Sequence, residues 1–332
     1  CKSGVSTTLI ERTAVASQAS GFAAGTIVPL SGKGIPGPLE ELAQVSFAMH
    51  IGLWNQLENE SGIDFQARRE SSLRVAFNQG DIDGLLTLYN YWKRLGTFSK
   101  HFSVDWVEPA EVRTIESRLS PEITKALYVE GTGALDSHQY TSALLKAAES
   151  YGCAFRTGSV KGIKRAANNR VTGVSLEDGE LACNNAVLAM GPWTYEAETW
   201  TKVPMPITPL KGQILRLNTP DPPLKLGISH NSNYLACKPD GLTWAGTTEE
   251  QVGFDTSPTL EAKSEIMEAA RKIMPCIDQS TLALHTACLR PDTPDGLPII
   301  DRIPGWDGLF TATGAARKGI LLSLAMGQAA AD

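Results

Sequence analysis

Short apolar runs in this chain repeatedly stop at glycine or other small residues. The clearest runs are residues 6–11, 185–190 and 309–313. The first ends on Glu11, and the third leads into a helix that we expect to begin near Gly319. One such turn is common, but three in one chain favour an α/β layer, in which ligands bind where parallel strands end.

The acid that closes the first run matches part of a dinucleotide-binding unit. In that unit an Asp or Glu follows the first glycine of GxGxxG by about 20 residues and binds the ribose hydroxyls. Only ten residues precede Glu11, so we expect the first strand and its glycine loop to lie outside this chain. A lone acid after a strand is more often a solvated surface residue.

The stretch 14–25 is rich in alanine, serine and glycine. Small side chains let backbone amides approach an anionic ligand closely, although a flexible linker has the same composition.

Hydrophobic periodicity predicts the main helices and several strands. Apolar residues spaced three and four apart predict an amphipathic helix over 39–60. Further helices are expected over 81–95, 140–151 and 260–274, and strands over 160–163, 171–176, 213–217 and 234–245. The proline-punctuated stretch that begins at Pro204 is predicted to form a second, antiparallel domain.

Composition excludes several classes of function. The 332 residues suggest two domains or one large one, at about 150 residues per domain. The net charge of −6, without a Lys/Arg stripe, argues against a nucleic-acid partner. No apolar run reaches the roughly 18 residues of a membrane span, and the N-terminus is unlike a secretion signal, so a cytoplasmic location is expected. The six cysteines lack a CxxC pair, so we expect reduced thiols and no metal site.

Several stretches, taken in order, resemble the FAD-dependent oxidases of the D-amino-acid-oxidase family, and within it the glycine oxidases of thiamine biosynthesis. These stretches are Thr-Leu-Ile-Glu-Arg at 8–12, Gly-Pro-Trp at 191–193, Pro-Leu-Lys-Gly-Gln at 209–213, and Leu-Arg-Pro-Asp-Thr-Pro-Asp-Gly-Leu-Pro-Ile-Ile at 289–300 joined to 314–321. The resemblance implies an α/β (α+β overall) fold. A discontinuous, Rossmann-like FAD-binding domain would comprise residues 1–45, 138–205 and 284–332. An antiparallel-sheet substrate domain would comprise 46–137 and 206–283.

The resemblance also implies FAD as the cofactor and assigns residues to it. Glu11 and Arg12 would contact the adenosine ribose, and Val160 would meet the adenine through its backbone. The loop near the flavin and phosphates would hold Ala19, Ser20, Ala24, Gly25 and Thr26. The remaining contacts would come from Gly191, Trp193 and the wall around the isoalloxazine ring, which is Gly314, Ala315, Ala316, Arg317, Lys318, Gly319, Ile320 and Leu321.

By the same resemblance, Arg290 would bind the substrate carboxylate, and Tyr234 and Arg317 would complete the pocket. A bidentate arginine fixes the α-carbon in an orientation that favours reaction. Two structural alternatives stay open, namely an ion pair of Arg290 with Asp292 or Asp295 and core packing of Tyr234. His230 is a lesser candidate for a site role.

The implied reaction is oxidative deamination of glycine, sarcosine or another small amino acid or amine. Hydride transfer to FAD would be followed by imine hydrolysis, with oxygen as the acceptor and peroxide as a product. One alternative is a D-amino-acid dehydrogenase that passes electrons to a quinone or carrier. Another is an inactive, truncated fragment unable to hold FAD. The oligomeric state is left open, with a homo-oligomer as one option.

Overall fold

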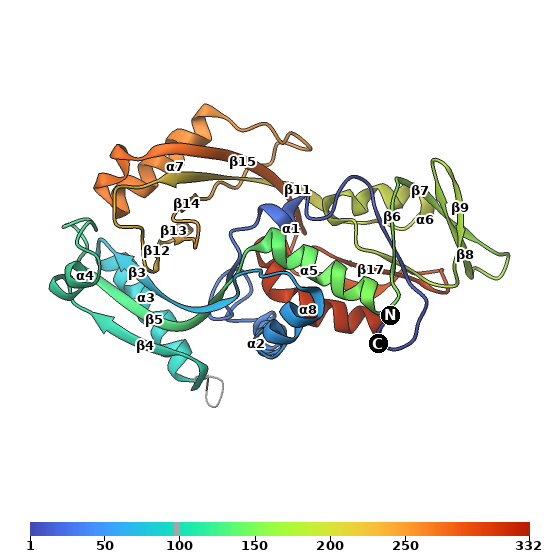
Figure 1. Ribbon diagram of the computed structural model, residues 1–332, viewed down its shortest axis with the longest axis horizontal. Helices are drawn as coiled ribbons and strands as arrows, with labels where there is room; N and C mark the ends of the chain where they lie inside the picture. The colour runs from blue at the N-terminus through green and yellow to red at the C-terminus, as the bar shows by residue number, and fades with distance from the viewer. Residues whose placement is uncertain (96–99) are drawn as a thin grey trace.

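The computed structural model describes residues 1–95 and 100–332 and shows a mixed α/β molecule. A large curled sheet forms one end of the molecule, and several small sheets of short strands form the other (Figure 1). Within the described residues, no helix combines the length and the apolar character needed to cross a lipid bilayer.

The large sheet gathers strands from distant parts of the chain. Its strands are β2 (Thr26–Ile27), β3 (Arg68–Ala76), β4 (Ser103–Val107), β5 (Lys125–Ala134), β11 (Thr208–Asn218), β12 (Gly227–His230), β13 (Asn233–Cys237), β14 (Thr243–Gly246) and β15 (Thr281–Asp292). The order is β15-β11-β14-β13-β12-β3-β5-β2, and β4 pairs with β5. We expected an antiparallel sheet, but β12 runs parallel to β3, so the sheet is mixed. A long connection rather than a hairpin links these two strands, which permits the parallel direction.

The two faces of this sheet differ in polarity. Leu73, Ile228 and Leu235 belong to an apolar core together with residues of helix α7 (Leu260–Ile273). Successive side chains of a strand point to opposite faces, so their neighbours Arg74 and Tyr234 lie on the other face. That second face lines a cavity.

The short apolar runs predicted at 6–11, 185–190 and 309–313 form parallel strands outside the large sheet. β1 (Thr8–Glu11) pairs with β6 (Ala154–Thr157), and β10 (Ala186–Leu188) pairs with β17 (Leu309–Thr313). β16 (Ile299–Arg302) runs antiparallel to β17. A separate antiparallel sheet contains β7 (Val160–Arg165), β8 (Val171–Leu176) and β9 (Gly179–Ala182).

Five of the α-helices were predicted from the sequence. They are α2 (Glu40–Ser61), α3 (Gln79–Lys93), α5 (Ser137–Ser150), α7 and α8 (Gly319–Ala331). Side chains of Asn78, Asp136 and Thr259 cap α3, α5 and α7 by accepting backbone N–H groups. The other helical segments are α1 (Ala19–Phe22), α4 (Pro109–Ile115), α6 (Glu198–Thr201) and the 3₁₀ turns η2 (Gly191–Ala197), η3 (Pro275–Gln279) and η4 (Ala316–Lys318). The short α1 interrupts a stretch that we expected to be a loop.

The predicted division into two domains stays a prediction. The boundary after residue 45 falls inside α2, which packs against α5 and α8 near the middle of the molecule (Figure 1). The large sheet takes most of its strands from 46–137 and 206–283, but β2 comes from the first predicted FAD-binding segment.

A buried histidine joins the three central helices. His50 of α2 donates through Nε2 to the carbonyl oxygen of Ile320 in α8, at 2.9 Å. The Tyr140 hydroxyl of α5 lies 3.4 Å from the other ring nitrogen, Nδ1. Burial lowers the pKa of His50 to about 4, so the ring is neutral in the folded protein near pH 7.

The lowered pKa of His50 predicts that the folded protein becomes less stable in mild acid. The unfolded chain binds a proton at His50 near pH 6.5, whereas the folded protein binds it only near pH 4, so lowering the pH favours unfolding. Between pH 7 and pH 5 the free energy of unfolding should fall by roughly 2 kcal/mol through this residue. Denaturant titrations of the wild type and of His50→Gln would measure it. An equal fall in both proteins would contradict the assignment.

Candidate active site

A cavity of about 890 Å³ lies between the polar face of the large sheet and the turn that leads into α8. The sheet contributes Arg74, Ser229 and Tyr234 to its lining. The opposite wall includes Ala315, Ala316, Arg317, Lys318 and Leu321. The cavity is within the size range of pockets that hold cofactors and small ligands.

Arg290 lies beside this cavity on β15 and is 8% exposed. Its Nη2 donates to Thr247 Oγ1 at 2.8 Å, and its Nη1 donates to the Thr248 carbonyl at 3.2 Å. The guanidinium covers Gly212, where any β-carbon would collide with it. Within the described residues Arg290 forms no ion pair with Asp292 or Asp295, so that structural alternative is not observed.

Tyr234 lies on β13, close to two arginines. Burial raises its pKa to about 12, and the charges of Arg290 and Arg317 act in the opposite direction. The phenol is therefore protonated at neutral pH and can donate a hydrogen bond. Tyr234 also packs against the apolar cluster of Ile214, Ala236 and Trp244, so the core-packing alternative describes part of its environment.

Arg317 connects the α8 side of the cavity to the sheet side. Its Nη1 lies 3.1 Å from Glu249 Oε1, and its Nη2 donates to the Ser232 carbonyl at 3.1 Å. The structure therefore brings Arg317 and Tyr234 to one cavity, with Arg290 beside them. His230 does not line this cavity. On β12 its neighbour Ser229 faces the cavity, whereas His230 faces the other way and its Nε2 lies 3.0 Å from Asp81 Oδ2.

Lys318 is the second cation on the α8 side. Its ammonium group donates to the Ser31 carbonyl and lies over Gly32. Burial, together with the nearby charges of Arg74 and Arg317, lowers its pKa to about 7. Gly314 precedes this turn with φ +84°, and Gly319 and Ile320 begin the helix that follows.

The N-terminal loop approaches the same cavity through Thr26. Gly25 has φ +74°, and a β-carbon there would strike the Leu135 carbonyl oxygen. Lys238, which follows β13, donates to the carbonyl oxygens of Ala24 and Leu135. Ala19 and Ser20 lie in α1 and do not line the cavity.

The remaining predicted cofactor residues meet at the ends of the parallel strands. Glu11 closes β1, and its carboxylate accepts from the Thr13 N–H at 3.1 Å. The Glu11 carbonyl accepts from the Gly158 N–H, which brings the segment before Val160 alongside. The Arg12 guanidinium lies 4.5 Å from the centre of the Trp193 ring. The Gly191 carbonyl accepts from Thr313 Oγ1 at 3.1 Å, which ties η2 to β17.

Sequence reasoning missed Arg74 and Lys238. Alternation along β3 places Ser72 and Arg74 on one face and Leu73 and Val75 on the other. This alternation of polar and apolar residues could have predicted that Arg74 lies on the polar face of a strand. Lys238 carried no such signal, because its contacts with the Ala24 loop depend on the tertiary structure.

The residues at the large cavity fit a flavin ring. Gly25 and Gly314 let the loop before Thr26 and the turn before α8 pack closely against Leu135 and Thr293, since a β-carbon at either would meet these neighbours. Lys318 and the start of α8 lie on this wall, where their positive ends would stabilise the negative charge that a bound flavin gains on reduction. Thr26 and 315–318 would hold the ring, which would accept a hydride when bound.

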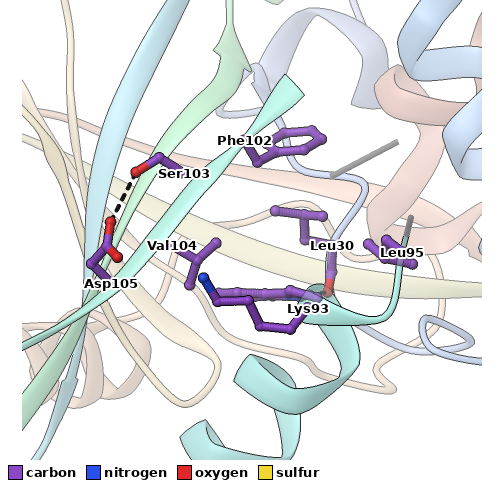
Figure 2. A pocket seen from close by; sticks show the side chains of 8 residues that line it. Leu30, Lys93, Leu95, Phe102, Ser103, Val104 and Asp105 are labelled. Atoms are coloured by element: carbon purple, nitrogen blue, oxygen red, sulfur yellow. Dashed lines mark hydrogen bonds between the residues drawn. The ribbon is translucent and has the colours of Figure 1, made fainter. Parts of the chain in front are cut away.

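A smaller cavity of about 240 Å³ lies between α3 and β4 (Figure 2). Its polar groups are already engaged. Ser103 Oγ donates to Asp105 Oδ2 at 3.0 Å, and Lys93 Nζ lies 5.1 Å from the centre of the Tyr89 ring. Mostly apolar side chains such as Leu30 and Val104 complete the lining, so this cavity offers no convergent catalytic groups.

Comparisons with known proteins identify the family of this chain. The sequence profile of the family described as FAD dependent oxidoreductase matches residues 1–332. The glycine oxidase of Geobacillus kaustophilus is 28% identical over 327 residues, which cover 98% of this chain and 85% of that enzyme. The hydrogen cyanide synthase subunit HcnC of Pseudomonas aeruginosa is 30% identical over 299 residues, which cover 88% of this chain and 70% of that subunit.

The solved structures show the same fold. The crystal structure of glycine oxidase from Bacillus cereus matches with a TM-score of 0.90 and 27% identity, covering 100% of this chain and 88% of that one. The family profile spans the whole chain, and the relatives named glycine oxidase cover nearly all of it in sequence and in fold. The chain therefore belongs to the FAD-dependent oxidoreductases of the D-amino-acid-oxidase family, and its similarity to glycine oxidases makes it an oxidoreductase that acts on the CH–NH₂ group of amino acids.

Proposed function

We propose that this protein oxidises glycine, sarcosine or another small amino acid or amine and passes the electrons to oxygen, which forms peroxide. The observation that carries the proposal is that Tyr234 and Arg317 line one cavity from opposite walls, with Arg290 beside Tyr234 and Lys318 on the α8 wall. The relatives named glycine oxidase support the substrate class.

Arg290 would hold the substrate carboxylate. Its two Nη atoms bond to neutral threonine oxygens, which a carboxylate can replace with stronger, charge-assisted bonds. The close fit over Gly212 limits how the guanidinium can turn, so the bound carboxylate would have one orientation.

Tyr234 and Arg317 would complete the binding of this carboxylate. Tyr234 is protonated at neutral pH and can donate its hydroxyl hydrogen. Arg317 is already oriented by Glu249 and the Ser232 carbonyl, which reduces the entropy lost on binding.

The proposed reaction requires little acid–base catalysis by protein side chains. A substrate amine that enters neutral uses its nitrogen lone pair to expel the α-hydride, so no side-chain base is required. FAD, when bound, supplies the electron sink that accepts this hydride. Water then hydrolyses the imine product. The protein contributes orientation, because a fixed α-carbon makes the step effectively unimolecular.

The visible absorption spectrum tests the proposal directly. The purified protein should show a flavin band, and anaerobic glycine or sarcosine should bleach it. Admitting air should restore the band and yield peroxide. Reoxidation by a quinone or dye but not by oxygen would instead favour the dehydrogenase alternative. A folded protein with no flavin band after incubation with FAD would contradict the proposal.

Arg290→Lys should impair substrate binding although the positive charge is kept. A lysine ammonium is a point charge and cannot make the two parallel bonds of a guanidinium. The substrate concentration for half-maximal flavin reduction should rise by a factor of roughly 10 to 100, the equivalent of about 1.4 to 3 kcal/mol for a lost charge-assisted bond. Stopped-flow reduction would measure this change, and an unaltered value would exclude Arg290 as the clamp.

Gly212→Ala tests the same residue without changing it. The new methyl group would push the Arg290 guanidinium off its place over the β11 backbone. Half-saturation by glycine should rise about tenfold, as for one lost charge-assisted bond. Gly162→Ala is the matched control, since Gly162 also lies in a strand and a β-carbon there meets no atom within 4 Å. Equal effects of the two substitutions would argue against a role for the Arg290 position.

A further inference from the structure

The charges that line the large cavity do not balance. Three carboxylates line it, and each has a cation as partner. Glu249 pairs with Arg317 at 3.1 Å, Glu70 with Arg68 at 3.2 Å, and Asp292 with Lys33 at 4.0 Å. Arg74 and Lys318 also line the cavity, and neither has a carboxylate partner among residues 1–95 and 100–332. The four residues outside those ranges include no acid.

Lys318 belongs to the wall that we assign to the flavin, so the cation left without a function is Arg74. Its Nη2 donates to Ser31 Oγ at 2.7 Å, and its other N–H groups have no hydrogen-bond partner among the described residues. A largely buried guanidinium without an anion is costly, because it loses hydration and gains no compensating charge. This cost points to a ligand that supplies the anion.

The Arg74 side chain is held in place before any ligand arrives. Its guanidinium lies 5.3 Å from the centre of the Trp92 ring. Trp92 is 2% exposed, and its indole N–H donates to the Leu30 carbonyl, which fixes the ring. With Ser31 on one side and Trp92 on the other, Arg74 has the preorganisation expected of a binding residue.

The sheet register places Arg74 near the proposed carboxylate site but separate from it. Arg74 is paired with Ser229 of β12, and Ser229 is paired with Tyr234 of β13. Residues paired in register point to the same face, and adjacent strands lie about 4.8 Å apart. The α-carbons of Arg74 and Tyr234 are therefore about 10 Å apart across one cavity. A small ligand with two anionic ends can contact both residues.

We propose that Arg74 binds a second carboxylate of the substrate, assisted by the hydroxyl groups of Ser72 and Ser229, which share its face. The substrate class would be amino acids or N-substituted glycines that carry two carboxylates. One carboxylate would bind at Arg290 and Tyr234, and the other at Arg74. This inference rests on the proposed function, because it uses the same cavity and the same carboxylate clamp.

The test compares substrates within one FAD-loaded enzyme. Anaerobic stopped-flow reduction would be measured with D-aspartate, D-glutamate and iminodiacetate. The neutral counterparts are D-asparagine, D-glutamine and N-ethylglycine, and glycine serves as the reference. For wild type we expect at least one dicarboxylate to half-saturate at a concentration tenfold or more below its neutral counterpart. A preference for iminodiacetate alone places the second carboxylate on the nitrogen substituent, and a preference for D-aspartate or D-glutamate places it on the side chain.

Three variants assign this preference to a residue. Arg74→Gln should abolish the ratio between dicarboxylate and neutral substrate, and Arg74→Lys should restore part of it. Lys33→Gln is the matched control, since it removes a cation from the same cavity that already pairs with Asp292, and it should keep the ratio. The flavin spectrum and thermal unfolding of each variant would verify folding.

The possible failures are distinguishable. If glycine reduces the flavin but no dicarboxylate is preferred, or if the preference survives Arg74→Gln, the inference is overturned and the proposed function stands. If no amino acid of either set reduces the flavin of a folded, FAD-loaded protein, the proposed function itself fails.

Discussion

The alternation of side chains across the large sheet determines most of this structure. Residues such as Leu73, Ile228 and Leu235 must be buried under α7, so their sequence neighbours must face the other way. A slip of one residue in β3 would bury Arg74 in that core and expose Leu73 to the cavity. The hydrophobic core on one face therefore fixes the polar site on the other.

The opposite wall of the cavity is positioned by polar contacts rather than by a sheet. His50 bonds to the Ile320 carbonyl, Lys318 bonds to the Ser31 carbonyl, and Arg317 pairs with Glu249. These contacts come from three different regions of the chain, and together they set the position of the 315–321 turn against Tyr234. A hydride transfer depends on such spacing, because a small misplacement of the reacting atoms slows the step strongly.

The sequence was sufficient for elements with a clear local signal. The apolar spacing predicted α2, and the strand-and-glycine pattern located β10, β17 and the start of α8. It did not predict β3, because Arg68, Glu70 and Arg74 resemble a solvated surface when the partner strands are unknown. Arg290 was expected from the family resemblance, but its threonine partners and its fit over Gly212 required the paired strands. The site residues as a set stay a prediction.

Unpaired cations in the cavity lower the stability of the ligand-free protein. The pKa of Lys318 falls to about 7 in the folded state, so the unfolded chain binds more protons between about pH 7 and pH 10. Folding stability from this residue therefore rises with pH across that interval and is smallest at and below pH 7. An anionic ligand at this wall would raise the Lys318 pKa and reverse this loss. The fold thus accepts a cost near neutral pH that an anionic ligand at this wall would offset, a trade-off common at functional sites.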